Sequence, residues 1–187
     1  MNRSLILAGG IVLLAAISGL CGDPALNPVG VEYYTRVNIW SEKNSEISAR
    51  NYHVGAMIPV GTKVKITGFA GDKIMFEIIK DGTGCTIIND PKRTGVDLAG
   101  LFVRYFADKD VTAMFGAFRK LSKEDQAYIR KGDIVAGMTR DAVIMSYGYP
   151  PGFKTPSLAG NVWTYWNDKG HRRRVVTFKD DIVVMVE

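Results

Sequence analysis

Cysteine and histidine are scarce in this chain of 187 residues, which holds two of each. Neither a Cys-x-x-Cys nor a His-x-x-x-His spacing occurs, so we expect no metal site and no bound cofactor. Two cysteines also do not form the disulfide framework that stabilises many small secreted domains. The formal net charge of +5 is mild and no nucleic-acid-binding motif is present, so nucleic acid is not an expected partner.

A catalytic thiol is the one enzyme chemistry for which the sequence offers residues. Cys85 and His53 could in principle form a nucleophile and its base. Cys85, however, falls within a predicted strand and not at a helix N-terminus, where a thiolate would be stabilised. No Asp or Asn has a spacing that suggests a group to orient the histidine. We therefore expect a non-catalytic protein, with a thiol hydrolase as the least favoured alternative.

The first residues carry the features of an export signal. After Arg3, residues 4–21 contain no charge and are dominated by Leu, Ile and Ala. A short basic start followed by such an apolar stretch is typical of a secretory signal, and the stretch is shorter than the roughly 20 apolar residues of a spanning helix. We expect residues 1–22 to direct the chain into the cell envelope.

The end of this signal has two interpretations. Cys21 lies where a lipoprotein signal carries its acylated cysteine, which predicts an anchor on the periplasmic side of the outer membrane. Leu20 is bulkier than the residue usually found at its position, and cleavage after Ser18 would satisfy the preference for small residues through Ala16 and Ser18. Ordinary cleavage predicts a periplasmic protein instead.

Residues 28–92 are predicted to form a β-rich domain. Short runs rich in β-branched residues are separated by glycine and aspartate turns, which is the pattern of a small antiparallel barrel. These runs are 32–40, 64–66, 74–79 and 85–88. The segment Ile58–Val64 resembles the start of a strand in bacterial SH3-like domains, and Ser41–Met57 matches the long first loop of such a barrel.

Aromatic residues of this half suggest a second function. Tyr33, Tyr34, Trp40 and Tyr52 could line a groove for a peptide or a glycan, but they could equally fill the core of the barrel. Peptidoglycan binding is therefore the alternative to an adaptor role.

From residue 93 the pattern becomes helical. Apolar residues recur at steps of three and four up to Phe106, which predicts an amphipathic helix, and residues 93–120 are expected to connect two halves. Residues 121–187 predict a helix that starts at Ser122, a second helix capped by Thr139 and ended by Gly148, and a three-stranded meander. Its predicted strands are 162–166, 172–178 and 182–186. The predicted fold class is α+β.

Four motifs of this last third occur in order and at fitting separations. They are Gly137-Met138-Thr139, Gly148-Tyr149-Pro150, Trp163-Thr164-Tyr165 and Phe178-Lys179-Asp180. Together they resemble the SmpA/OmlA (BamE-like) domain, a family of small envelope lipoproteins that includes the accessory subunit of the outer-membrane β-barrel assembly machine. The resemblance implies two helices packed on a three-stranded antiparallel sheet, favours lipidation of Cys21, and implies an envelope protein complex as partner. It does not extend into the β-rich half.

Strand alternation separates two faces of the meander. Trp163 and Tyr165 point one way, and Val162, Thr164 and Trp166 point the other. A sheet covered by helices on one side leaves its other side in solvent, and aromatic residues beside arginines are typical of a recognition surface. The candidate partner-binding residues are Trp163, Tyr165, Arg172 and Arg174, although core packing is the favoured interpretation for the two aromatic residues.

The basic run 171–174 has two further interpretations. Its cations could bind anionic lipid head groups, each contributing about 1 kcal/mol near such a surface. They could also form a solvated strand start that discourages pairing with another sheet edge. The function favoured by these patterns is a non-catalytic envelope adaptor.

Overall fold

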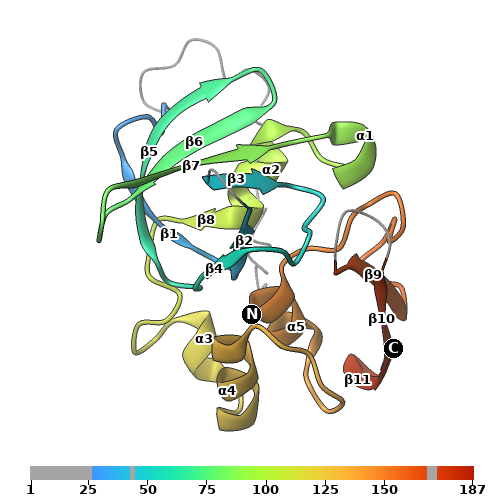
Figure 1. Cartoon of the computed structure of the whole chain (residues 1–187). Helices are drawn as coiled ribbons and strands as arrows, with labels where there is room; N and C mark the ends of the chain where they lie inside the picture. Colours follow the sequence, from blue (N-terminus) through green and yellow to red (C-terminus); the bar gives the residue numbers. More distant parts are fainter. Residues whose placement is uncertain (1–26, 43–44, 168–171) are drawn as a thin grey trace, which may run out of the picture.

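The structure is a computed structural model that describes residues 27–42, 45–167 and 172–187. The predicted signal segment, with Cys21, lies outside these residues. The described chain is a mixed α+β protein, as the sequence predicts, with a curled sheet from its first half and a smaller sheet from its last third (Figure 1). Within the described ranges, no helix has the length and apolar character needed to cross a membrane.

The elements follow one another in chain order from β1 to β11. The strands are β1 (Glu32–Thr35), β2 (Ile39–Ser41), β3 (Glu46–Ser48), β4 (Ala56–Ile58), β5 (Lys63–Ala70), β6 (Lys73–Ile78), β7 (Thr83–Ile88), β8 (Phe106–Ala107), β9 (Val162–Trp166), β10 (Arg173–Lys179) and β11 (Ile182–Val186). The helices are α1 (Pro91–Thr94), α2 (Leu98–Tyr105), α3 (Ala117–Lys120), α4 (Lys123–Lys131) and α5 (Arg140–Tyr147).

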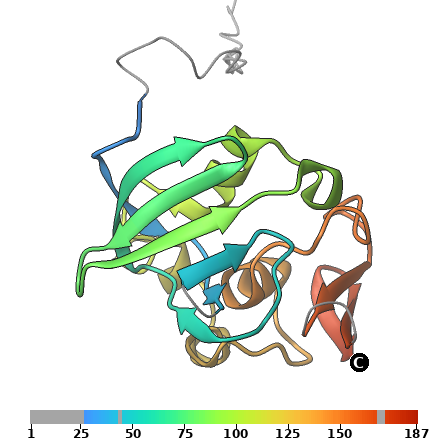
Figure 2. The same cartoon turned by 45° about the horizontal axis from the view of Figure 1, so that its top comes forward.

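The curled sheet has the strand order β3-β7-β6-β5-β1-β8 and bends into a half-barrel (Figure 2). Successive side chains of a strand point to opposite faces, which explains the core of this sheet: Val64 and Ile66 of β5 are buried, whereas Lys63 and Lys65 are exposed. Helix α2 packs on this core, with Phe102 contacting Tyr33. Burying these apolar side chains stabilises the half-barrel by roughly 25 cal/mol per Å² removed from water.

Two expectations for this half are wrong. The sheet is not wholly antiparallel, because β3 pairs in parallel with β7. The stretch 41–57 is not one long loop, since it contains β3 and most of β4, and β4 pairs with β2. These strands have three residues each, and such short segments are held by partners distant in sequence, which local alternation does not reveal.

The predicted strand 32–40 is also interrupted. Asn38 lies between β1 and β2, and its buried amide donates to the carbonyl oxygens of Ile129 and Ser146 while its Oδ1 accepts from Val60 N at 2.8 Å. The polar side chain therefore fixes the bend between the two strands. The predicted helical connector likewise contributes a strand, since Phe106 and Ala107 form β8 beside β1.

The last third matches its predicted elements closely. The strands β9, β10 and β11 form an antiparallel sheet in the order β11-β10-β9. Ser122 caps α4 by accepting from Asp125 N, and Thr139 caps α5 by accepting from Ala142 N. A second core draws on both of these helices and on all three strands; its members include Ile129, Val143, Trp163, Val176 and Val183.

Candidate partner-binding surface

Trp163 and Tyr165, predicted as partner contacts, are both fully buried, with 0% of their surface exposed. The Trp163 ring lies 4.6 Å from the Phe178 ring and 5.4 Å from the Arg140 guanidinium. The Tyr165 hydroxyl donates to the carbonyl oxygen of Gly148 at 3.0 Å, and burial raises the pKa of this phenol well above its usual value. Core packing, the favoured interpretation, is confirmed for both residues, and the interpretation as partner contacts is wrong, because they occupy the face that packs into the second core.

Arg174 serves to join elements. Its guanidinium donates to the Tyr147 hydroxyl at 2.9 Å and forms an ion pair with Asp133 at 3.1 Å. These bonds connect β10 to α5 and to the loop before α5. Arg172 is exposed just before β10, and its predicted contact with a partner stays a prediction.

The opposite face of the three-stranded sheet is partly open to solvent. The strand register places Val162 beside Thr177, Thr164 beside Val175 and Trp166 beside Arg173, while Met185 of β11 lies opposite Thr177. We call this the outer sheet face, formed by Val162, Thr164, Trp166, Arg173, Val175, Thr177 and Met185. In Figures 1 and 2, α5 lies on one side of the sheet and no described element covers the other side.

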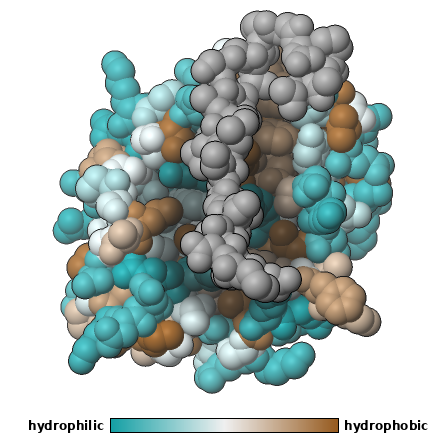
Figure 3. All heavy atoms as spheres, turned by 180° about the vertical axis from the view of Figure 1, so that it is seen from behind, coloured by the Kyte–Doolittle hydropathy of each residue, from teal (hydrophilic) through white to brown (hydrophobic). Residues whose placement is uncertain are grey.

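The outer sheet face is apolar for a solvent-exposed surface. Val162 is 52% exposed and Met185 is 46% exposed, and Val184, at the irregularity between β10 and β11, is 51% exposed. On the back of the molecule, hydrophobic and hydrophilic residues are interspersed where grey atoms do not cover them (Figure 3). Adjacent exposed apolar side chains with charges at their margin indicate an interaction surface.

His53 lies in a seam between the two halves. Its ring stacks on Tyr147 with the centroids 3.6 Å apart and meets Trp40 edge-on at 5.3 Å. Nδ1 lies 3.2 Å from the carbonyl oxygen of Trp166, and Nε2 lies 2.9 Å from that of Tyr147. Desolvation of the ring lowers the pKa of His53 to about 4. The two carbonyl contacts raise this pKa by less than desolvation lowers it, and the nearby Arg174 cation lowers it further.

The candidate thiol and base have separate surroundings. Cys85 is 4% exposed within the core of the curled sheet, and burial raises the pKa of its thiol. His53 instead contacts carbonyl groups of α5 and β9, and no hydrogen bond joins it to Cys85 in the described structure. Among the described residues, no group of three His, Cys, Asp or Glu side chains is placed to hold a metal ion.

The aromatic residues predicted to line a groove do not gather at one place. Tyr33 packs on Phe102, whereas Trp40 packs on His53. Tyr52 forms an isolated bridge with Trp166, whose ring stacks on Phe153 with the centroids 6.2 Å apart. Phe153 is 37% exposed and the Arg93 guanidinium lies over its ring. No local sequence pattern indicates this aromatic and cationic group, because its members come from separate segments.

Comparison of the chain with protein-family models, with curated proteins and with solved structures finds no match. The resemblance to the SmpA/OmlA domain therefore rests on the four motifs of the last third.

Proposed function

We propose that this chain is a non-catalytic adaptor of the cell envelope that binds a protein partner through the outer sheet face. The observation that carries the proposal is the exposure of Val162 and Met185, at 52% and 46%, on a sheet side that no described element covers. Arg173 lies at the margin of this apolar surface. Burial of a central apolar patch within a polar rim is the usual anatomy of a protein interface.

The envelope setting of this proposal comes from the sequence. Residues 1–22 have the composition of an export signal, and Cys21 is the proposed lipid attachment site. The order of two helices, α4 and α5, followed by three antiparallel strands agrees with the SmpA/OmlA resemblance and supports it. The partner inferred from that resemblance is an envelope protein complex of the outer-membrane assembly type.

The role of the curled sheet belongs to the same proposal. We infer that it is a partial SH3-like barrel that carries the outer sheet face at a fixed position. The turn at residues 59–62 supports this, because Thr35 Oγ1 donates to the carbonyl oxygen of Pro59 and accepts from Thr62 N.

The stacked pair Trp166 and Phe153, with Arg93 above it, is the feature that favours glycan binding as the second candidate function.

The proposal is tested by capture of partners from crosslinked cells with Val162→Glu combined with Met185→Glu. Both side chains are about half exposed, so the double variant should fold, while two carboxylates at the centre of an interface would be buried without partners. We expect the protein that co-purifies with the unmodified chain to fall at least tenfold, roughly 1.4 kcal/mol or more. The measurement is quantitative mass spectrometry.

A matched control keeps the number and type of new charges but places them elsewhere. Val29→Glu with Val31→Glu alters two valines that are 41% and 46% exposed outside the outer sheet face, and it should leave capture unchanged. Equal loss in both variants, or no loss in either, would overturn the proposed site. Arg174→Glu is a poor test, because it would break the bonds to Tyr147 and Asp133 and disturb the fold.

A further inference from the structure

The loop between β8 and α3 exposes two neighbouring apolar side chains. Met114 is 78% exposed and Phe115 is 89% exposed, more than any other large hydrophobic residue in the described part of the chain. We call residues 112–115 the loop tip. Apolar side chains that project in this way from a soluble surface mark a site where something else covers them.

The loop tip is held in place by its own base. Asp110 Oδ1 accepts from Thr112 N and from Thr112 Oγ1, both at 2.7 Å. Gly116 N donates to the Ala113 carbonyl at 2.9 Å and Phe118 N donates to the Val111 carbonyl at 3.0 Å, which draws the two ends of the loop together. A Cβ on Gly116 would lie 2.2 Å from the Val111 oxygen, so only glycine permits this close approach. Because the tip is already ordered, little conformational entropy is lost when it binds.

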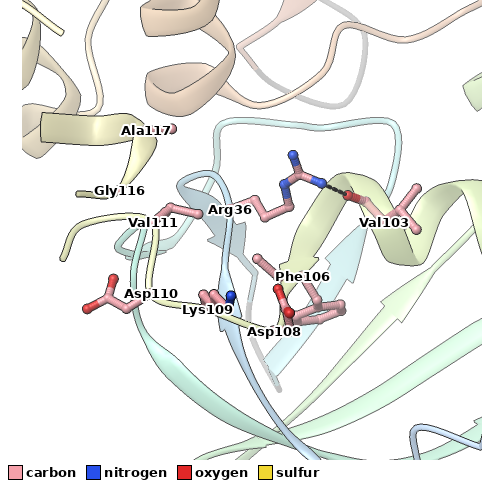
Figure 4. A pocket seen from close by; sticks show the side chains of 10 residues that line it. Arg36, Val103, Phe106, Asp108, Lys109, Asp110, Val111, Gly116 and Ala117 are labelled. Carbon is pink, nitrogen blue, oxygen red and sulfur yellow. Dashed lines mark hydrogen bonds between the residues drawn. The ribbon is translucent and has the colours of Figure 1, made fainter. Parts of the chain in front are cut away.

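A hollow opens beside the tip. Its volume is about 450 Å³, and it lies between the end of α2, the loop that carries the tip and Arg36 (Figure 4). Its apolar walls include Val103, Phe106 and Val111, and the Arg36 guanidinium donates to the Val103 carbonyl at 2.8 Å. An apolar cavity of about 150 Å³ is enough to hold a benzene ring, so the hollow has room for a phenylalanine side chain. Phe115 does not fill the hollow of its own chain, since it is almost wholly exposed.

The charges around the hollow decide between two kinds of occupant. Arg36 and Lys109 line it together with Asp108 and Asp110, so cations and carboxylates are present in equal number. An anionic membrane gains about 1 kcal/mol from each nearby cation, and the two carboxylates would offset that gain. A rim of mixed sign instead complements a second copy of itself, because each cation can face a carboxylate of the other copy.

We propose that the chain forms a two-fold symmetric dimer in which the loop tip of each copy enters the hollow of the other. The tip and the hollow share one loop and therefore one surface, which is the condition for a closed contact in which the same patch is used by both copies. The dimer surface does not include the outer sheet face. This inference therefore goes beyond the proposed function and stands or falls separately from it.

The first experiment is sedimentation velocity of the full chain in detergent micelles over a range of concentrations. We expect a concentration-dependent dimer, and Phe115→Ser should weaken self-association by at least about 30-fold, as removal of a central aromatic anchor does. Val184→Ser is the matched control, because Val184 is 51% exposed on the three-stranded sheet and lies outside the proposed contact. Its dimer should be unchanged.

The second experiment traps the contact with a disulfide. Val103→Cys combined with Met114→Cys, which keeps Phe115, should yield a covalent dimer under mild oxidation, because Met114 is 78% exposed on the loop tip. Lys80→Cys combined with Met114→Cys should not, since Lys80 lies on the turn after β6. A monomer at every concentration without trapping would overturn the proposal. So would a dimer that Phe115→Ser leaves intact, or a monomer whose binding to vesicles of anionic lipid depends on Phe115.

Discussion

At the scale of single residues, the sequence predicts which side chains of β9 share a face, but not which of the two faces is buried. The pattern separates Trp163 and Tyr165 from Val162, Thr164 and Trp166. Bulky aromatic residues suit both a core and an interface, so only the position of the helices decides which set is buried. The structure buries Trp163 and Tyr165 and places Val162, Thr164 and Trp166 on the outer side, so the candidate surface contains residues that the sequence did not single out.

The position of His53 could not be predicted from the sequence either. No neighbouring residue in the sequence indicates that its ring packs between Trp40 and Tyr147 in the seam between the two halves. We predict that this residue makes the protein less stable in acid. Its pKa is about 4 in the folded chain and about 6.5 when exposed, so the unfolded chain binds the proton more readily. The contribution to stability is complete above pH 6.5 and is lost as the pH falls toward 4, by on the order of 3 kcal/mol.

The measurement is urea unfolding at a series of pH values between 7.5 and 4 for the unmodified chain and for His53→Gln. Glutamine can still donate to a neighbouring carbonyl but does not titrate. We expect the variant to show the smaller loss of stability on acidification, the difference between the two proteins being the part due to His53. Parallel curves for the two proteins would contradict this assignment.

At the scale of elements, a helix or strand could be predicted where turn or capping residues mark its ends. The meander was predicted within about a residue because 167–170 and 179–181 are turn sequences that bound alternating runs. Ser122, Thr139 and Gly148 marked helix ends in the same way. The strands β3 and β4 were missed, and β2 was merged with β1 into one run, because three residues carry no period and their pairing depends on partners brought close by the fold.

Gly148, where α5 ends, yields a prediction about stability. Its backbone has φ 74° and ψ −170°, a conformation open almost only to glycine, and a Cβ there would lie 2.8 Å from the Asn51 amide nitrogen. That amide donates to the carbonyls of Tyr147 and Tyr149 and so fastens the curled half to α5. We expect Gly148→Ala to lower the free energy of unfolding by roughly 2–3 kcal/mol, from backbone strain together with a displaced hydrogen bond.

Gly84→Ala is the control for this change, measured by the same urea titration. Gly84 lies in β7 with no atom near its missing Cβ, so the substitution should alter stability by less than about 0.5 kcal/mol. If the two alanine variants were equally stable, the Gly148 turn would not be the constraint described.

At the scale of the whole molecule, the sequence predicted two halves, and the structure shows how side chains join them. Ile144 packs against both cores, Asn38 reaches from the curled half to carbonyls of α4 and α5, and His53 stacks on Tyr147. Such contacts link residues about a hundred positions apart, and no local pattern marks them. Their consequence for function is that the outer sheet face and the curled sheet hold a defined relative position.

The central claim is that the outer sheet face binds a protein of the envelope, and photo-crosslinking in living cells tests it most directly. A photoreactive amino acid at Met185 should yield one or a few discrete crosslinked proteins, whereas the same group at Thr83, exposed at the start of β7, should yield none. Crosslinks from residue 153 to cell-wall fragments, with no protein captured from residue 185, would favour glycan binding instead. Absence of any protein crosslink from residue 185, or the same products from residues 185 and 83, would contradict the claim.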